Sequence, residues 1–162
     1  MPGFLENLQL VDTMPKQLML LLHLGGVIIW VGGMFFAYFC LRPAAGRVLE
    51  PPMRLPLWVA TFEPFFRITA IAVSVILLTG FAMFFEVGFK LAPAGWNVMM
   101  LLGLLMSVIF AYVYGVLYPR LRRHCDASAW PAAATALNAI RKLVAANLVL
   151  AAGTVVAALF LK

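Results

Sequence analysis

Four long hydrophobic runs, separated by short polar segments, dominate the chain. They cover residues 18–41, 68–85, 96–118 and 143–161, and none of them contains Asp, Glu, Lys or Arg. An uncharged apolar run of about 18 or more residues predicts a membrane-spanning helix. A soluble helical bundle would need polar stripes at the helical period, and these runs have none. We therefore predict an all-α integral membrane protein.

Short connections between the runs define how the helices are arranged. Four spans joined in this way predict an up-down-up-down bundle that forms a single domain over residues 1–162. We expect its helices at about residues 17–41, 65–87, 96–118 and 137–161. The composition agrees, because the 162 residues are 65% hydrophobic and 11% charged, whereas a soluble domain is about half apolar and a quarter charged.

The basic residues are divided unevenly between the two sides of this predicted bundle. Nine of the twelve Lys and Arg residues lie in or next to the first and third connections: Arg42, Arg47, Arg54, Arg67, Arg120, Arg122, Arg123, Arg141 and Lys142. The opposite side carries Lys16, Lys90 and Lys162. The positive-inside rule predicts that both termini are outside, in an N-out/C-out topology. This topology explains the pI of about 9.8, so no nucleic-acid partner is needed.

Two features at the ends of the runs carry further expectations. The first connection contains Pro51, Pro52 and Pro56, which we expect to keep it non-helical. Glu63 and Arg67 are four residues apart, a spacing that favours an ion pair at the membrane edge.

The two cysteines, Cys40 and Cys125, fall on the predicted reducing side and lack the spacing of a metal motif. We interpret them as ordinary thiols.

His23 is a titratable residue within the first apolar run. It lies seven residues past Lys16, which places it about 10 Å below the outer boundary at about 1.5 Å per residue. An ionisable residue inside the membrane predicts a functional site. The alternative is a buried histidine that forms a hydrogen bond to a neighbouring helix.

The helical face around His23 carries small and aromatic residues. At about 100° per residue, His23 shares this face with Met19, Gly26, Trp30 and Gly33. Small residues on a membrane helix usually indicate close packing of a neighbouring helix. The sharper interpretation is that the bare backbone leaves room for a flat ligand bound at His23.

Possible partners for His23 must lie at a similar depth. His124 is in the third connection, and about 28 Å of helix separates His23 from that side. One chain therefore cannot supply a bis-histidine site, although a symmetric dimer could. Methionines at a matching depth are Met83, Met99 and Met100, and Met100 points toward the small, polar side of its helix. Thioether sulfur suits haem iron or Cu(I).

Two residues of the fourth run complete the candidates. Thr154 lies at a depth similar to that of His23. Asn147 shares its helical face, and we predict that it forms a hydrogen bond between helices.

Several segments resemble one known family. "HLGGVIIWVGGMFF" is similar to the first helix of the CopD-type copper-resistance membrane proteins and of the related HemJ-type protoporphyrinogen oxidases, with a tryptophan seven residues after the histidine. "RITAIAVSVILLTG" resembles the second CopD helix, with its Arg start and Thr-Gly end. "GWNVMMLLGLLMSVIFAYVYG" resembles the third HemJ helix, and "ALNAIRKLVAANLVL" the fourth helix of the group. The resemblance covers about residues 18–161.

The resemblance implies a four-helix core in the bacterial inner membrane, with both termini then periplasmic. It implies haem b in the HemJ branch, copper handling in the CopD branch, and His23 as the haem or metal ligand. Met100 stands where the HemJ branch has a functionally important lysine, a departure that argues against protoporphyrinogen oxidase activity. A methionine there suits a haem with His and Met ligands.

Three functions follow as expectations. In the first, haem b binds near the periplasmic side through His23 and Met100, beside Gly26, Trp30 and Gly33, and exchanges electrons with an unknown redox partner. In the second, His23, Met19, Met83 and Met100 hold copper as part of copper transport or tolerance. In the third, the protein is a cofactor-free assembly or scaffold subunit. Each is compatible with contact to the lipid bilayer and with a homo-oligomer.

Overall fold

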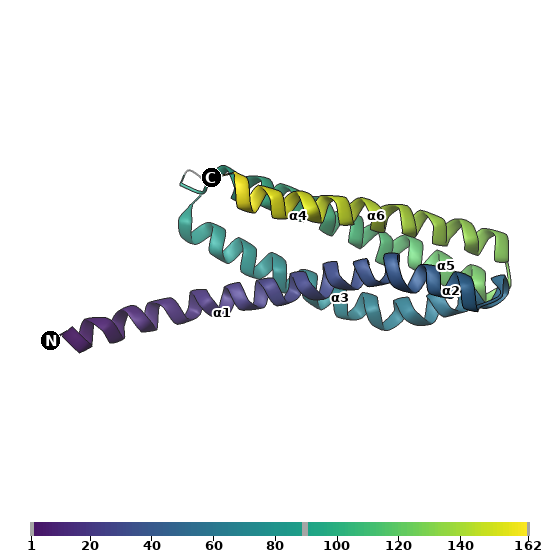
Figure 1. Ribbon diagram of the computed structural model, residues 1–162, viewed down its shortest axis with the longest axis horizontal. Helices are drawn as coiled ribbons and strands as arrows, with labels where there is room; N and C mark the ends of the chain where they lie inside the picture. The colour runs from purple at the N-terminus through teal and green to yellow at the C-terminus, as the bar shows by residue number, and fades with distance from the viewer. Residues whose placement is uncertain (1, 89–90, 162) are drawn as a thin grey trace.

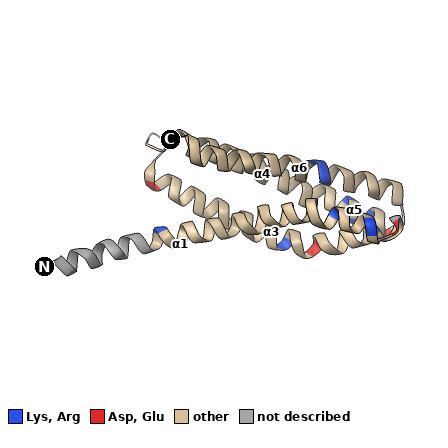
Figure 2. Cartoon of the chain, viewed as in Figure 1, with Lys and Arg blue, Asp and Glu red and all other residues tan. Residues whose placement is uncertain are grey.

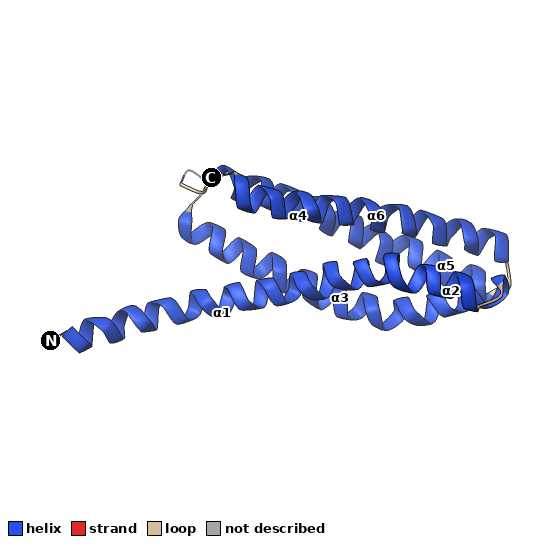
Figure 3. Ribbon diagram, in the orientation of Figure 1, coloured by secondary structure: helices blue, strands red, loops and turns tan. Residues whose placement is uncertain are grey.

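The computed structural model describes the backbone of residues 2–88 and 91–161, and the side chains of residues 15–50, 52–88 and 91–161. All regular structure in this part of the chain is helical (Figure 3). Four helices are long and apolar enough to cross a membrane, and they cover Pro15–Val48, Pro52–Val87, Ala94–Asp126 and Trp130–Phe160. The predicted all-α membrane bundle is confirmed.

Each of the first and third spans is a continuous helix with a π-helical segment inside it. The first consists of α1 (Pro2–Phe35), η1 (Phe36–Leu41) and α2 (Arg42–Val48). The third consists of α4 (Ala94–Tyr112), η2 (Val113–Leu117) and α5 (Tyr118–Asp126). The second span is α3 (Pro51–Val87) and the fourth is α6 (Trp130–Phe160).

The helices associate mainly as two pairs, α1 with α3 and α4 with α6, and α5 also packs on α6 (Figure 1). The arginine-rich end of the bundle is formed by α2, α5 and the starts of α3 and α6, and most of the described basic residues gather there (Figure 2). The opposite end, which carries Lys16 and His23 on α1, is the histidine end. The uneven charge distribution inferred from the sequence is thus present in the folded chain.

The first connection is largely helical, so the expectation of a non-helical segment over residues 42–56 is wrong. α2 occupies Arg42–Val48, and α3 already begins at Pro51. Pro51 and Pro52 stand in the first helical turn, where the missing N–H has no intrahelical partner to lose. Pro56 lies inside α3, in a membrane helix of the kind that tolerates proline.

Two prolines account for the π-helical segments. Pro43 and Pro119 each follow the end of a π segment by two residues, and each lacks the N–H of an α-helical hydrogen bond. Just before them, the N–H of Arg42 donates to the carbonyl of Ala37, and that of Tyr118 to the carbonyl of Val113. These bonds span five residues, so the widened turn redistributes the backbone hydrogen bonds around each proline.

The hydrophobic core is concentrated toward the arginine-rich end. Trp58, Phe62 and Phe66 follow one another on one face of α3, with ring centroids 5.1 and 4.9 Å apart. Phe66 also contacts Phe110 and Tyr118 across the bundle. The four-residue spacing on α3 brings these rings onto a single stripe, and this stripe holds the two helix pairs together.

At the histidine end, the helices are joined by small residues and backbone contacts. The N–H of Gly95 donates to the carbonyl of Leu161 at 3.0 Å, which fixes the start of α4 to the end of α6. A Cβ at Gly95 would overlap the carbonyl oxygens of Ala157 and Leu161. Only glycine permits this approach of two backbones.

Candidate functional site

His23 contacts α3, and its hydrogen bond defines the chemistry of the imidazole. Its Nδ1 lies 3.0 Å from Oγ1 of Thr79, which is buried with 8% of its surface exposed. The Thr79 hydroxyl donates its proton to the carbonyl of Val75 at 2.6 Å. With the Thr79 proton on that carbonyl, the hydroxyl oxygen accepts from His23 in the tautomer that carries the proton on Nδ1. In this tautomer the lone pair of the neutral ring is on Nε2.

This arrangement resembles the surroundings of histidines that bind metals. Such a histidine usually donates its second ring N–H to a protein acceptor, which fixes the tautomer and the orientation of the ring. Gly80, next to Thr79, provides room for the ring, since a Cβ there would lie 3.2 Å from His23 Cε1. Thr79 and Gly80 were not proposed as site residues from the sequence, although they form the Thr-Gly end on which the family resemblance partly rests.

Met19 and Met83 lie on the two helices that meet at His23. Met19 is four residues before His23 on α1, and Met83 is four residues after Thr79 on α3. Beyond them, Lys16 Nζ and Glu86 Oε2 lie 4.0 Å apart. Because residues four apart share a helical face, Met19 shares the His23 face of α1 and Met83 shares the Thr79 face of α3.

Two glycines of α1 are in close contact with α3. A Cβ at Gly26 would lie 2.7 Å from Ile76 Cγ1, and a Cβ at Gly33 would overlap the ring of Phe65. Their neighbours Gly25 and Gly32 have open space instead. The first of the two interpretations of these glycines, close packing of a neighbouring helix, is confirmed. The face of α1 that was considered for a flat ligand is covered by α3.

The other predicted site residues lie elsewhere in the bundle. Trp30 is 3% exposed and packs edge-on against Phe110 of α4, with centroids 6.0 Å apart. Met100 is partly buried on α4, whose main partner is α6 rather than α1. The structure thus places Met100 on the other helix pair from His23, Met19 and Met83. In the described part of the chain, no group of three or more His, Cys, Asp and Glu residues could hold a metal ion.

Three minor expectations from the sequence are confirmed. Asn147 is buried and its Nδ2 donates to the carbonyl of Met106, so it joins α6 to α4. The Arg67 guanidinium donates to the Glu63 carboxylate. Cys40 and Cys125 are free thiols.

Comparison with known proteins identifies the family. The sequence profile of the family described as copper resistance protein D matches residues 59–161, which is more than half of the chain. The chain belongs to the copper resistance protein D family. For this member of the copper resistance protein D family, the comparisons with curated proteins and with solved structures found no match.

The profile match includes some candidate residues and leaves others out. It contains Thr79, Gly80, Met83 and Met100, whereas Met19 and His23 precede it. The match supports the CopD part of the resemblance, while the likeness to HemJ-type oxidases stays a prediction. The chain is thus a multi-pass membrane protein of the copper resistance protein D family. Some of its candidate ligands lie within the matched residues and others precede them.

Proposed function

We propose that this protein handles copper in the membrane and binds Cu(I) at the α1–α3 interface through His23 Nε2 and the sulfurs of Met19 and Met83. Copper is here the cargo of the protein. The description of the family supports the choice of metal. The hydrogen bond from His23 Nδ1 to Thr79 carries the proposal, because it leaves Nε2 as the free ligand atom.

The ligand chemistry favours Cu(I) over harder cations. Imidazole nitrogen and thioether sulfur are soft, neutral donors, whereas Mg²⁺ and Ca²⁺ require oxygen ligands. A monovalent ion held by neutral groups brings a single charge into the low-dielectric interior of the membrane, where each additional charge is costly. The set of one histidine and two methionines therefore suits the metal and the surroundings.

Haem b, with His23 and Met100 as axial ligands, is the other cofactor hypothesis. The packing described above does not favour it, because α3 covers Gly26 and Gly33 and Met100 belongs to the α4–α6 pair. A visible absorption spectrum of the purified protein tests it directly. A stoichiometric Soret band that is lost in His23→Gln would replace the copper proposal by the haem hypothesis and its electron transfer.

Copper binding is tested by competition with a chromophoric Cu(I) chelator in detergent under reducing conditions. We expect one ion per chain, a loss of affinity of about a hundredfold in His23→Gln, and about tenfold in Met19→Leu and in Met83→Leu, because even outer-shell groups contribute about ten- to a hundredfold. Met53→Leu is the matched control, since Met53 is 60% exposed at the arginine-rich end. Equal affinities in wild type and His23→Gln would contradict the proposal.

The protein also needs a membrane and an orientation in it. We infer a bacterial inner membrane with both termini in the periplasm, from the family resemblance and the arginine-rich end. The copper site would then lie toward the periplasmic side. A fusion of alkaline phosphatase after Lys162 should be active, and a cytoplasmic reporter at the same position should be inactive. The reverse result would place His23 near the cytoplasm.

A further inference from the structure

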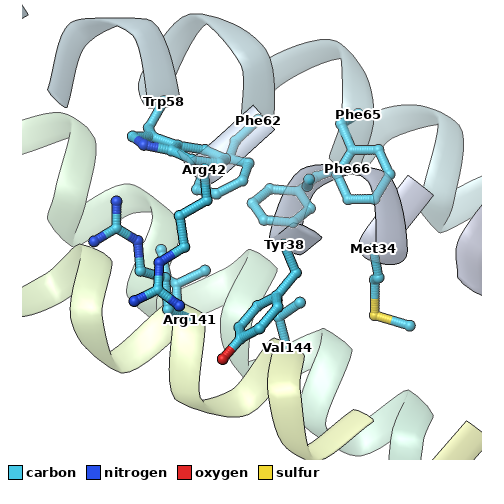
Figure 4. Close-up of a pocket in the computed structure, with 11 residues that line it drawn as sticks. Met34, Tyr38, Arg42, Trp58, Phe62, Phe65, Phe66, Arg141 and Val144 are labelled. Atoms are coloured by element: carbon cyan, nitrogen blue, oxygen red, sulfur yellow. The ribbon is translucent and has the colours of Figure 1, made fainter. Parts of the chain in front are cut away.

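A pocket at the arginine-rich end lies away from His23. It is lined by residues of α1, η1, α2, α3 and α6, among them Tyr38, Arg42, Trp58, Phe66, Arg141 and Val144 (Figure 4). Apart from the two arginines, its walls are aromatic and aliphatic. We call it the arginine pocket.

The two guanidinium groups in the arginine pocket have no anionic partner in the described part of the chain. Among the described residues, the ion pairs are Lys16–Glu86 and Glu63–Arg67. Arg42 lies over the ring of Tyr38 at 5.2 Å, and Arg141 over the ring of Trp58 at 5.6 Å. Ring faces attract a cation only weakly compared with a carboxylate or phosphate oxygen.

Two buried hydrogen-bond donors in the same pocket also find no partner within residues 15–50, 52–88 and 91–161. Trp58 is 3% exposed. Neither its indole N–H nor the Nε of Arg141 has a hydrogen-bond partner among the described residues. Buried donors of this kind are normally paired. Figure 4 shows the guanidinium groups of Arg42 and Arg141 on the same side of the pocket as the indole nitrogen.

Two like charges meet at this pocket. The side chain of Arg54 donates to the carbonyls of Leu49 and Gly46, whereas Arg42 and Arg141 line the pocket. An anion between these two guanidinium groups would offset the repulsion between them.

The π-helical segment η1 contributes to the shape of this site. It contains Tyr38 and ends one residue before Arg42. A π turn adds a residue to the helical turn, so it changes the direction of the side chains that follow, and such turns often occur at functional sites. Pro43 explains why the chain forms η1. The changed side-chain directions after η1 contribute to the shape of the arginine pocket.

We propose that the arginine pocket binds an anionic phospholipid, with the headgroup phosphate between Arg42 and Arg141 and one acyl chain along Met34, Phe65 and Val144. The phosphate accepts hydrogen bonds from both guanidinium groups. Basic pockets between membrane helices at the border of the apolar region bind anionic headgroups in this way. The apolar lining accounts for an acyl chain, which a free phosphate ion lacks.

Native mass spectrometry of the protein in an uncharged detergent tests this proposal. The probes are phosphatidylglycerol, phosphatidylcholine with the same acyl chains, and inorganic phosphate. We expect one tightly bound phosphatidylglycerol in the wild-type protein. Arg42→Gln and Arg141→Gln should each weaken its binding by about tenfold or more, because each removes a charge-assisted hydrogen bond. Arg122→Gln, at the same end but outside the pocket, should bind as the wild type does.

A second measurement keeps the test independent of folding. Arg42 is exposed, so Arg42→Gln should keep the melting temperature of the wild type even if Arg141→Gln does not fold. A brominated phosphatidylglycerol should quench the fluorescence of Trp58 in a variant in which Trp30, Trp96 and Trp130 are replaced by Phe. Equal binding of phosphatidylcholine, competition by inorganic phosphate at equal concentration, or equal affinity in Arg42→Gln and Arg122→Gln would each overturn the proposal.

Discussion

The two ends of the bundle are held together by different means. At the arginine-rich end, large rings and fully buried aliphatic side chains fill the space between all four spans, as Phe66, Leu121 and Ile140 show. At the histidine end, α1 and α3 meet through a hydrogen bond and the contact of Gly26 with Ile76, and α4 meets α6 through Gly95. The arginine-rich end therefore holds most of the apolar packing, and the histidine end is joined by smaller and polar contacts.

This difference follows from the physics of helix association in lipid. Lipid tails are as apolar as leucine, so burial of apolar surface gives little driving force between helices, and packing and hydrogen bonds decide instead. Large interlocked rings give the strongest packing. In the proposed function, the copper ligands lie apart from this packing, at the histidine end.

The largest effect is expected from Phe66→Ala, which tests whether the arginine-rich end carries the stability. Phe66 is 2% exposed and contacts rings of α3, α4 and α5. Its truncation should lower the free energy of unfolding in detergent by about 4 kcal/mol, the usual cost of removing a buried phenylalanine. Phe36→Ala is the control, because Phe36 is 58% exposed. Equal melting temperatures for both variants would mean that the ring stripe is not the core.

Thr79→Val is the next largest change and concerns the histidine end. The valine keeps the shape of threonine but removes the acceptor of the His23 Nδ1–H, so the ring loses its fixed tautomer. Cu(I) affinity should fall about ten- to a hundredfold, or about 1.4 to 2.7 kcal/mol. Thr61→Val is the control, since the Thr61 hydroxyl donates to the Leu57 carbonyl of its own helix. If Thr79→Val bound Cu(I) as tightly as the wild type, the hydrogen bond would have no role in orienting His23.

A pair of glycine variants sharpens the comparison further. Gly33→Ala adds a Cβ that overlaps the Phe65 ring, while Gly32→Ala adds one in open space. We expect Gly33→Ala to lower the unfolding free energy by about 1 kcal/mol through overpacking. Gly32→Ala should leave it unchanged or raise it slightly, because alanine favours the helix. The opposite order of the two melting temperatures would place the contact face of α1 one residue away.

The smallest effect is expected from Asn147→Leu. This change removes the hydrogen bond to the Met106 carbonyl between α6 and α4. Hydrogen bonds between membrane helices average about 0.6 kcal/mol, so the unfolding free energy should fall by about that amount. A loss of several kcal/mol, comparable to that of Phe66→Ala, would show that polar contacts carry as much stability as the aromatic stripe.

Much of this molecule follows from local sequence patterns. The four uncharged runs determine the number of spans, and the arginine distribution determines which end is basic, because each depends on only the length and charge of a segment. The pairing of Glu63 with Arg67 also follows from spacing along one helix. The first connection was mispredicted because the same prolines that disfavour a helix interior are well accommodated in the first turn of α3.

The sites depend on relations between helices that no single segment contains. His23 could be singled out from the sequence, but its acceptor Thr79 lies 56 positions away, and only packing of α1 on α3 brings them together. The same packing separates His23 from Met100, which its depth, its helical face and the family resemblance had made a candidate. The arginine pocket arises likewise from residues of α2, α3 and α6. Periodicity fixes the face of a residue on its own helix, whereas its partner is decided by which helices pack together and at what register.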